Sequence, residues 1–245
     1  MLKNRPKFSI VTITKDNSLG LRATLVSVAE QEYKDFELIV VDGHSVDDTP
    51  TVIDEFDIIV AKFVQDAGEG IYAAMNQCIS LASGEWIIFM NAGDCFIGTQ
   101  VLSKFAPQSG TDLAFGRAQK TNGAPQNPYQ SLDNIWKNMP CSHQALFCRT
   151  ELFRYRPFDV SFRISGDFDF VMEQYANKKR FEYLDLDVAV VDGDGISELH
   201  LVKRVTEAYR SARQYFRWNF KMHFYYYRKL RWAQKEQSKR ANLLG

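Results

Sequence analysis

The 245-residue sequence has few cysteines, no long apolar run and no net charge. Its four cysteines fit reduced thiols in a cytoplasmic protein better than a disulfide framework. No apolar run approaches the roughly 18–20 residues of a membrane-spanning helix. The polar residues 1–7 lead directly into an apolar run, which argues against a secretory signal. We therefore expect a cytoplasmic protein with no membrane span.

The absence of net charge conceals an uneven distribution. From residue 203 onward there are 12 basic residues and 2 acidic ones, so that 18 basic and 28 acidic residues precede them. An acidic body thus carries a basic tail with an excess of 10 positive charges. Such an asymmetry favours a separate binding role for the tail.

The first hundred residues alternate between two hydrophobic patterns. β-Branched apolar runs predict buried parallel strands, and apolar residues three or four positions apart predict helices. Helices are expected between the strands, the last over residues 70–82 with Ser83-Gly84 as its C-cap. This alternation indicates a mostly parallel sheet with helices on both faces. The expected strands cover residues 8–14, 36–41, 58–63 and 85–90.

Polar residues lie at or just beyond the ends of these strands. Ligands of open α/β sheets bind beyond the carboxyl ends of the strands, so these side chains are expected to converge on one edge. They are Thr12, Thr14, Asp42, Ser45, Asp66, Asn91 and Asp94.

The second half of the chain is less regular. The segment 120–132 is rich in Asn, Gln, Pro and Gly, which predicts a loop, and Gly193-Asp-Gly195 precedes a long helical region over about 198–240. Further strands are expected over 112–116, 145–148 and 181–191, with a helix over 167–177.

Two acidic segments are candidates for chemistry. In Asn91-Ala-Gly-Asp94 a carboxylate follows a strand and can hold Mg²⁺ or Mn²⁺ against a diphosphate, although the same residues also favour a simple turn. In Ser165-Gly-Asp167-Phe-Asp169 two carboxylates open a helix, where one of them can act as a cap. A general base requires one exposed carboxylate, and Asp167 is the first available.

A third segment contains Cys141, His143 and Cys148. Their spacing matches no common zinc signature, and the residues before Cys148 resemble a buried strand, so zinc is disfavoured. His143 and Gln144 remain candidates for lining an acceptor pocket.

Taken in order, several segments resemble glycosyltransferase family 2, a group with the GT-A fold. The match covers about residues 8–195 and is similar to enzymes of bacterial exopolysaccharide, O-antigen and colanic-acid-type assembly. The segments that carry it are Ser9–Thr14, Gln31–Asp47, Gly70–Asn76 with Ala82–Trp86, Phe89–Asp94 and Gly166-Asp167.

The resemblance implies an α/β fold of the GT-A (Rossmann-like) kind with a C-terminal helical extension. The catalytic domain would cover 1–197, with a nucleotide-sugar-binding half (1–97) and an acceptor half (98–197), and the basic-aromatic extension would cover 198–245. The implied reaction is inverting transfer of a sugar from a nucleotide-sugar, by preference a UDP-sugar, to a hydroxyl of a glycan. A polyprenyl-diphosphate-linked acceptor in bacterial surface polysaccharide synthesis and a divalent Mn²⁺ or Mg²⁺ cofactor are part of the same expectation.

The resemblance also implies a role for individual residues. Asp167 would deprotonate the acceptor hydroxyl, and Asp94 would ligate the metal. His143, Gln144 and Asp169 would contact the acceptor. The donor would be bound by Thr12, Thr14, Asp42, Ser45, Asp66, Asn76, Asn91 and Asp94.

The sequence departs from the family pattern at the metal motif. That motif commonly reads D-x-D-D, and here its first and third positions are Asn91 and Gly93. The loss keeps open a non-catalytic nucleotide-sugar-binding or scaffold protein on the same fold. A nucleotidyltransferase is disfavoured because Thr14–Ser18 is not a Gly-rich phosphate loop.

The basic tail interleaves aromatic residues with Arg and Lys over residues 209–232. A helix of this composition can dock on anionic lipid, which would place the protein on the inner face of the cytoplasmic membrane. Alternatively, its aromatic residues pack on the catalytic domain or on a second subunit in a homodimer. Nucleic-acid binding is disfavoured because it leaves the acidic body and the ordered strand-end motifs unexplained.

Overall fold

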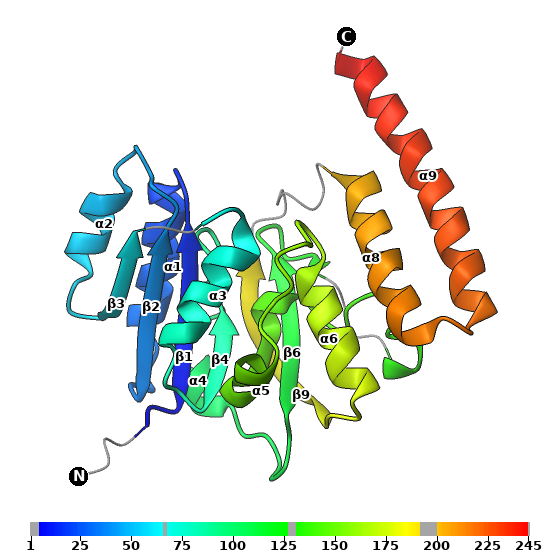
Figure 1. Cartoon of the computed structure of the whole chain (residues 1–245). Helices are drawn as coiled ribbons and strands as arrows, with labels where there is room; N and C mark the ends of the chain where they lie inside the picture. Colours follow the sequence, from blue (N-terminus) through cyan, green and yellow to red (C-terminus); the bar gives the residue numbers. More distant parts are fainter. Residues whose placement is uncertain (1–4, 66–67, 127–130, 192–199, 245) are drawn as a thin grey trace.

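The computed structural model describes residues 5–65, 68–126, 131–191 and 200–244, with side chains described up to residue 239. Its centre is a single sheet with helices on both faces, and two long C-terminal helices lie beyond one end of it (Figure 1). Nine strands of the described residues pair in the order β3-β2-β1-β4-β8-β6-β9-β5, with β7 beside β6.

The amino-terminal half forms the parallel part of the sheet. β2, β1 and β4 are almost entirely buried, because helices cover both faces, and β3 is a more exposed edge strand. The predicted alternation of strands and helices is confirmed, although β3 begins two residues later than expected. The elements are β1 (Phe8–Thr14), α1 (Ser18–Ala29), β2 (Phe36–Asp42), α2 (Thr49–Glu55), β3 (Val60–Gln65), α3 (Ile71–Leu81) and β4 (Trp86–Phe89).

The second half extends the same sheet in mixed orientation. β8 pairs antiparallel with both β4 and β6, and β9 pairs parallel with β6. The elements are β5 (Cys95–Phe96), α4 (Val101–Lys104), β6 (Leu113–Lys120), β7 (Pro125–Gln126), the 3-10 helices η1 (Leu132–Asn134) and η2 (His143–Ala145), β8 (Leu146–Arg149), α5 (Thr150–Tyr155), α6 (Gly166–Ala176) and β9 (Phe181–Val191).

Two hydrophobic cores lie on the two faces of the sheet. Neighbouring residues of β1 point to opposite faces, so Ile10 packs with α1 and α4 while Val11 packs with α3 and α6. In the second core, the rings of Phe153 and Phe170 stack 4.2 Å apart and join α5 to α6. The first turn of α6, which carries Asp167, is therefore held in place by the packed core beneath it.

The predicted C-cap role of Ser83-Gly84 is wrong. α3 ends at Leu81, and its C-cap Ala82 has an extended backbone. Gly84 instead allows close approach to β1, because a Cβ atom there would lie 2.5 Å from the backbone nitrogen of Ser9. A glycine that resembles a helix stop is thus required for strand packing.

The predicted C-terminal helical region consists of two helices, α8 (Leu201–Phe216) and α9 (Phe220–Leu244). α8 packs beside α6, and α9 packs beside α8 (Figure 1). Met222 and Ala233 of α9 are fully buried, and the Tyr226 hydroxyl donates to the Trp136 carbonyl at 2.7 Å. Both helices thus share a core with the sheet, and the predicted domain boundary at residue 197 falls outside the described residues.

Within the described part of the chain, no helix combines the length and apolar character needed to cross a membrane.

Candidate active site

A cavity of about 930 Å³ opens at the carboxyl ends of β1 and β4. Its walls come from both halves of the sheet and from the C-terminal helices. A cavity of this size suits a nucleotide-sized ligand. Six of the predicted site residues line it, namely Thr14, Asn91, Asp94, His143, Gln144 and Asp167.

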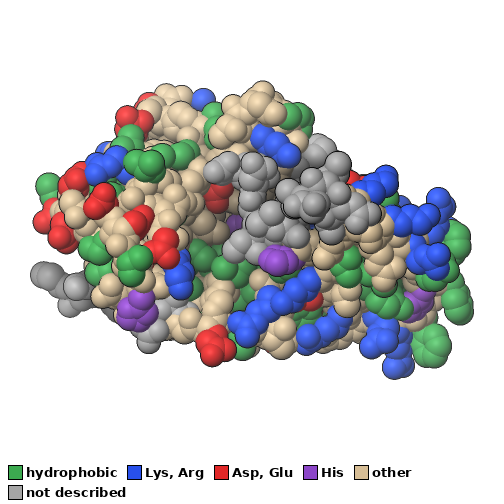
Figure 2. All heavy atoms as spheres, turned by 90° about the horizontal axis from the view of Figure 1, so that it is seen from above, with side chains coloured by type: hydrophobic (Ala, Val, Ile, Leu, Met, Phe, Trp, Pro, Cys, Tyr) green, Lys and Arg blue, Asp and Glu red, His purple; other side chains and the backbone are tan. Residues whose placement is uncertain are grey.

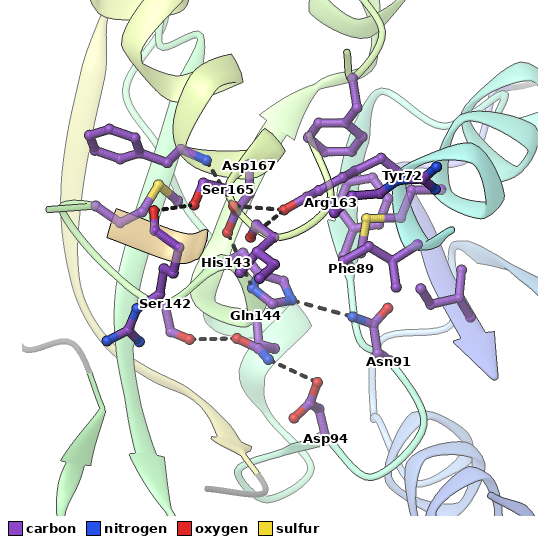
Figure 3. Close-up of a pocket in the computed structure, with 18 of the residues that line it drawn as sticks. Tyr72, Phe89, Asn91, Asp94, Ser142, His143, Gln144, Arg163, Ser165 and Asp167 are labelled. Carbon is purple, nitrogen blue, oxygen red and sulfur yellow. Dashed lines mark hydrogen bonds and ion pairs between the residues drawn. The ribbon is translucent and has the colours of Figure 1, made fainter. Parts of the chain in front are cut away.

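Asp167 lies in the first turn of α6 and points into the cavity (Figure 3). Its Oδ1 accepts a hydrogen bond from the Phe168 backbone at 2.9 Å and lies 3.0 Å from the Tyr72 hydroxyl. Its Oδ2 lies 3.6 Å from Nδ1 of His143. The carboxylate is 25% exposed, so it is oriented by its neighbours and still accessible to a ligand.

Tyr72 of α3 holds Asp167 from one side. The tyrosine hydroxyl also lies 2.7 Å from the Ile164 carbonyl, so its single proton goes to one acceptor or the other. Burial and the negative charge of Asp167 raise the pKa of Tyr72 well above its usual value, which keeps the hydroxyl protonated. This contact requires glycine at position 166, because a Cβ atom there would lie 2.9 Å from the Tyr72 ring.

A chain of polar contacts joins Asp167 to the end of β4. His143 contacts Asp167 through Nδ1, and its other ring nitrogen, Nε2, lies 3.3 Å from the Asn91 side-chain nitrogen. Gln144, the next residue, donates from Nε2 to Asp94 Oδ2 at 2.9 Å and accepts from the Ser142 hydroxyl. The His143-Gln144 pair thus contacts both carboxylates that the sequence indicates as functional (Figure 3).

The turn from Asn91 to Asp94 offers oxygen atoms suited to a hard cation. The Asn91 side-chain oxygen is buried and has no hydrogen-bond partner among the described residues. It lies on the same turn as the Asp94 carboxylate. No group of three or more His, Cys, Asp or Glu side chains in the described part of the chain is arranged to hold a metal. Mg²⁺ takes one or two protein oxygens and completes its shell with water and substrate phosphates, so a site of that kind needs only the Asp94 carboxylate and one further oxygen.

The cavity edge formed by the predicted donor-binding residues at the ends of β1 and β2, here called the donor edge, is built in two layers. Thr14, Lys15 and Asn17 line the cavity directly. Thr12 and Asp42 are completely buried beneath it. The Thr12 hydroxyl donates to the Met90 carbonyl at 2.8 Å, which ties β1 to β4.

The second tie of the donor edge joins the loops after β1 and β2. Asp42 accepts from the backbone and hydroxyl of Ser45, and Ser45 in turn accepts from the backbone of Asp16 at 2.7 Å. Thr12, Asp42 and Ser45 therefore shape the donor edge from below, and none of them lines the cavity.

Two further predicted site residues, Asn76 and Asp169, do not line the cavity. Both ends of the Asn76 amide are bonded to the Phe158 backbone at 2.9 Å. Asp169 is 1% exposed, pairs with Arg156 at 3.1 Å, and has its pKa raised by burial. It cannot face the same way as Asp167 because two helical positions differ by about 200° around the axis. Asp66 lies outside the described residues.

Glu207 of α8 is a site residue that sequence reasoning missed. It is 8% exposed, and its carboxylate accepts hydrogen bonds from the backbone N–H groups of Arg163, Ile164 and Ser165 at 2.8–3.2 Å. These residues lead directly into Asp167. The only sequence signal was an acidic residue in a strongly basic helix, and nothing local shows which segment it binds.

Comparison with known proteins agrees with this geometry. Residues 9–168 match the family model described as Glycosyl transferase family 2. The chain belongs to this family. The match starts in β1 and ends one residue after Asp167, so it contains both the donor edge and the predicted base.

Relatives of this family 2 glycosyltransferase include a "PGL/p-HBAD biosynthesis glycosyltransferase" of Mycobacterium bovis. It is 32% identical over 182 residues, covering 70% of this chain and 71% of that one. An "uncharacterized glycosyltransferase" of Mycobacterium tuberculosis is 28% identical over 186 residues, covering 70% of both chains.

Solved structures show the same fold. S. aureus TarS 1–349 in complex with UDP-GlcNAc superposes with a TM-score of 0.68 at 20% identity, over 86% of this chain and 67% of that one. In the crystal structure of the same TarS fragment whose description names no ligand, this chain covers 66% of the TarS chain. The mannosyltransferase PcManGT of Pyrobaculum calidifontis, in complex with GDP-Man and Mn²⁺, superposes with a TM-score of 0.67 at 18% identity, over 98% and 76%. The GT-A fold expected from the sequence is thereby confirmed.

Proposed function

We propose that this family 2 glycosyltransferase inverts the anomeric centre of a UDP-sugar and transfers the sugar to a hydroxyl of a glycan acceptor. The observation that carries the proposal is the position of Asp167. Its carboxylate is accessible from the cavity and contacts Tyr72 and His143. Polar contacts through His143 and Gln144 connect it to the turn from Asn91 to Asp94. A general base must lie opposite the leaving group for an in-line displacement, and the lining of one cavity by both Asp167 and Asp94 supports this pairing.

In the proposed step, the acceptor hydroxyl donates its proton to Asp167 while its oxygen attacks the anomeric carbon. The bond from that carbon to the diphosphate oxygen breaks, and its electron pair leaves with the nucleoside diphosphate. One displacement inverts the configuration. Tyr72 and His143 hold the carboxylate in position, and the protonated Tyr72 leaves the accepting role to Asp167.

Asp94 and the Asn91 side-chain oxygen would hold Mn²⁺ or Mg²⁺ at the diphosphate. When bound, this cation neutralises the charge that develops on the leaving group. Gln144 orients Asp94 through its 2.9 Å hydrogen bond. Lys15 adds a positive charge to the same edge of the cavity.

We further propose that the acceptor is linked to a lipid and that the reaction contributes to surface glycan synthesis at the cytoplasmic face of the membrane. The UDP-GlcNAc bound to TarS supports a UDP donor, and the name of the mycobacterial relative, a PGL/p-HBAD biosynthesis glycosyltransferase, supports a biosynthetic role. Exposed aromatic and basic residues of the C-terminal helices support the lipid linkage.

The surface around the α8–α9 turn supports docking on an anionic membrane. Trp218, Phe220 and Phe224 are 63–83% exposed, and Arg217 and Arg228 lie over the rings of Trp218 and Phe224. Figure 2 shows basic side chains over the C-terminal helices on the face opposite this turn. Exposed aromatic residues among cations suit the interface of an anionic bilayer. The alternative role of this surface is contact with a second copy of the chain in a homodimer.

The activity is tested by incubating the protein with UDP-, GDP- and dTDP-sugars, Mn²⁺, and a lipid-linked glycan fraction. We expect UDP release together with a new glycosidic bond of inverted configuration, assigned by NMR of the product. Transfer of the nucleotide rather than the sugar would indicate a nucleotidyltransferase. Binding of UDP-sugars without turnover on any acceptor would indicate the non-catalytic alternative.

A further inference from the structure

A second group of cations lines the cavity, away from the donor edge. It consists of Lys137, Arg204 of α8 and Lys229 of α9. Lys15, by contrast, follows β1 beside Thr14. The described lining also contains Arg163 and two carboxylates, Asp94 and Asp167. The cavity therefore has more positive charge than the donor edge alone provides.

The C-terminal helices hold this group near the base. The Arg204 carbonyl accepts from the Ser165 hydroxyl at 3.2 Å, two residues before Asp167. α9 is fixed to the segment that contains Lys137 through the bond from Tyr226 to the Trp136 carbonyl. The cations from these three segments are thus anchored to one wall of the cavity.

Lys229 is held among neutral groups. Its ammonium donates to the Asn138 side-chain oxygen at 3.2 Å and to the Tyr225 hydroxyl at 2.9 Å, and it lies 5.1 Å from the centre of the Tyr225 ring. No carboxylate of the described residues forms an ion pair with it. Burial, together with the nearby charge of Arg204, lowers the pKa of Lys229 to about 8. A bound anion would stabilise the charged form of Lys229 and so offset the unfavourable effect of burying its ammonium group.

Apolar side chains lie in the same part of the lining. Met139 follows Lys137 closely in sequence, and Val205 and Ala208 are on α8 with Arg204. Phosphate oxygens would meet the cations, while an attached apolar chain would meet these residues. This combination fits an amphipathic phosphate better than a second nucleotide.

We propose that Lys137, Arg204 and Lys229 bind a phosphate group carried by the acceptor. The group anchors the acceptor on the α8–α9 side, so that its sugar hydroxyl reaches Asp167 while the donor occupies the edge at Asp94. This inference rests on the proposed function, since it names a recognition element of the acceptor. It makes the C-terminal helices part of the substrate site.

The test uses the full chain, geranyl phosphate as the probe, and UDP with Mn²⁺ at saturating concentration to fill the donor edge. Calorimetry should show geranyl phosphate binding to the UDP-bound protein, with geraniol giving no heat. Lys229→Met and Arg204→Gln should each weaken this binding by about tenfold to a hundredfold, as expected for the loss of a charged hydrogen bond. The affinity for UDP should not change. The matched control is Arg231→Gln, which alters an exposed residue of α9 outside the cavity.

A pH series separates binding by Lys229 from a merely structural role. Because the free ammonium has a pKa of about 8, the affinity of the wild type for geranyl phosphate should fall between pH 7 and pH 9. The Lys229→Met variant should lack this fall. If thermal melting shows that Lys229→Met does not fold, Arg204→Gln tests the inference independently.

Three outcomes overturn the inference. They are competition between geranyl phosphate and UDP, equal weakening of both ligands by Lys229→Met, and no binding of geranyl phosphate to a protein that binds UDP. The first two would assign these cations to the donor diphosphate. Failure of UDP itself to bind the wild type would instead contradict the proposed function.

Discussion

The Glu207 carboxylate accepts a hydrogen bond from the backbone N–H of Ile164 at 2.8 Å, and further bonds from the N–H groups on either side. A residue of the C-terminal helices therefore fixes the segment that delivers Asp167 to the cavity. Carboxylates that accept several backbone hydrogen bonds are strongly bound, and removing the charge leaves buried donors poorly satisfied.

Glu207→Gln should lower kcat by about tenfold to a hundredfold, because a small displacement of the base is costly in an in-line reaction. The KM for the UDP-sugar should change little, since the donor edge is built from other segments. Steady-state kinetics measure both. Glu151→Gln, at an exposed position of α5, is the control and should behave as the wild type. An unchanged kcat in a folded Glu207→Gln variant would contradict the positioning role.

Asp167→Asn should reduce kcat by about 10²–10⁴-fold, the usual contribution of a general base, and leave UDP affinity intact. Tyr72→Phe should have a much smaller effect, because it removes one of several contacts to the carboxylate. Turnover is measured as UDP release and affinity by calorimetry. The exposed Asp57→Asn serves as the matched charge control. Full activity of Asp167→Asn would exclude this residue as the base.

Metal binding is tested by thermal shift with UDP, GDP, dTDP and CMP, each with and without Mn²⁺. A ligand that binds only the native state raises its stability with the logarithm of saturation. We expect a Mn²⁺-dependent rise in Tm with UDP that is lost in Asp94→Ala and reduced in Asn91→Ala, because both residues offer oxygens to the cation. The Mn²⁺ dependence should persist in Cys95→Ser, a neighbouring change that removes no oxygen ligand. Its persistence in Asp94→Ala would place the cation elsewhere.

The stability of the fold at low pH should depend on Glu37 of β2. Burial by itself would raise the pKa of Glu37, but hydrogen bonds from Lys62, Ser9 and Ser83 outweigh it and lower the pKa to about 2. A carboxylate with a depressed pKa stabilises the native state above its unfolded pKa of 4.5, and this contribution is lost as the pH falls to about 2.

Glu37→Gln should therefore destabilise the protein at pH 7 by about 3 kcal/mol, the equivalent of the pKa shift. The difference from the wild type should shrink between pH 4.5 and pH 2. Urea unfolding at several pH values measures it. A difference that is constant across this range would show that Glu37 contributes by packing rather than by charge.

Membrane docking should depend on the aromatic residues at the α8–α9 turn. Trp218→Ser combined with Phe224→Ser should weaken binding to vesicles with anionic lipid by at least about tenfold, because each ring removes apolar area from water when it inserts. Flotation of the protein with phosphatidylglycerol-containing vesicles measures this. Leu19→Ser, which changes an exposed apolar residue of α1, is the control. Unchanged flotation together with loss of a dimer in ultracentrifugation would assign the surface to self-association.

Much of the fold was predictable because its signals are local. Buried parallel strands are read from short β-branched runs, and polar residues at their ends must meet at one edge of a parallel sheet. Thr14, Asn91, Asp94 and Asp167 do meet in one cavity. The order of the motifs also identified the family. The role of Gly84, in contrast, could not be predicted. A glycine that ends a helix and a glycine that allows close packing of a strand occur in similar local sequences.

The sequence alone therefore determined the parallel sheet, the family and the edge at which the site lies. Only the tertiary structure decided that Asp167 faces the cavity while Asp169 turns into an ion pair with Arg156, that Glu207 holds the segment before the base, and that Lys229 reaches the same cavity. Glu207 and Lys229 are far in sequence from the residues that they meet. Asp167 and Asp169 are close in sequence but point in different directions around the helix axis. Packing of whole elements sets them, and no local pattern records that packing.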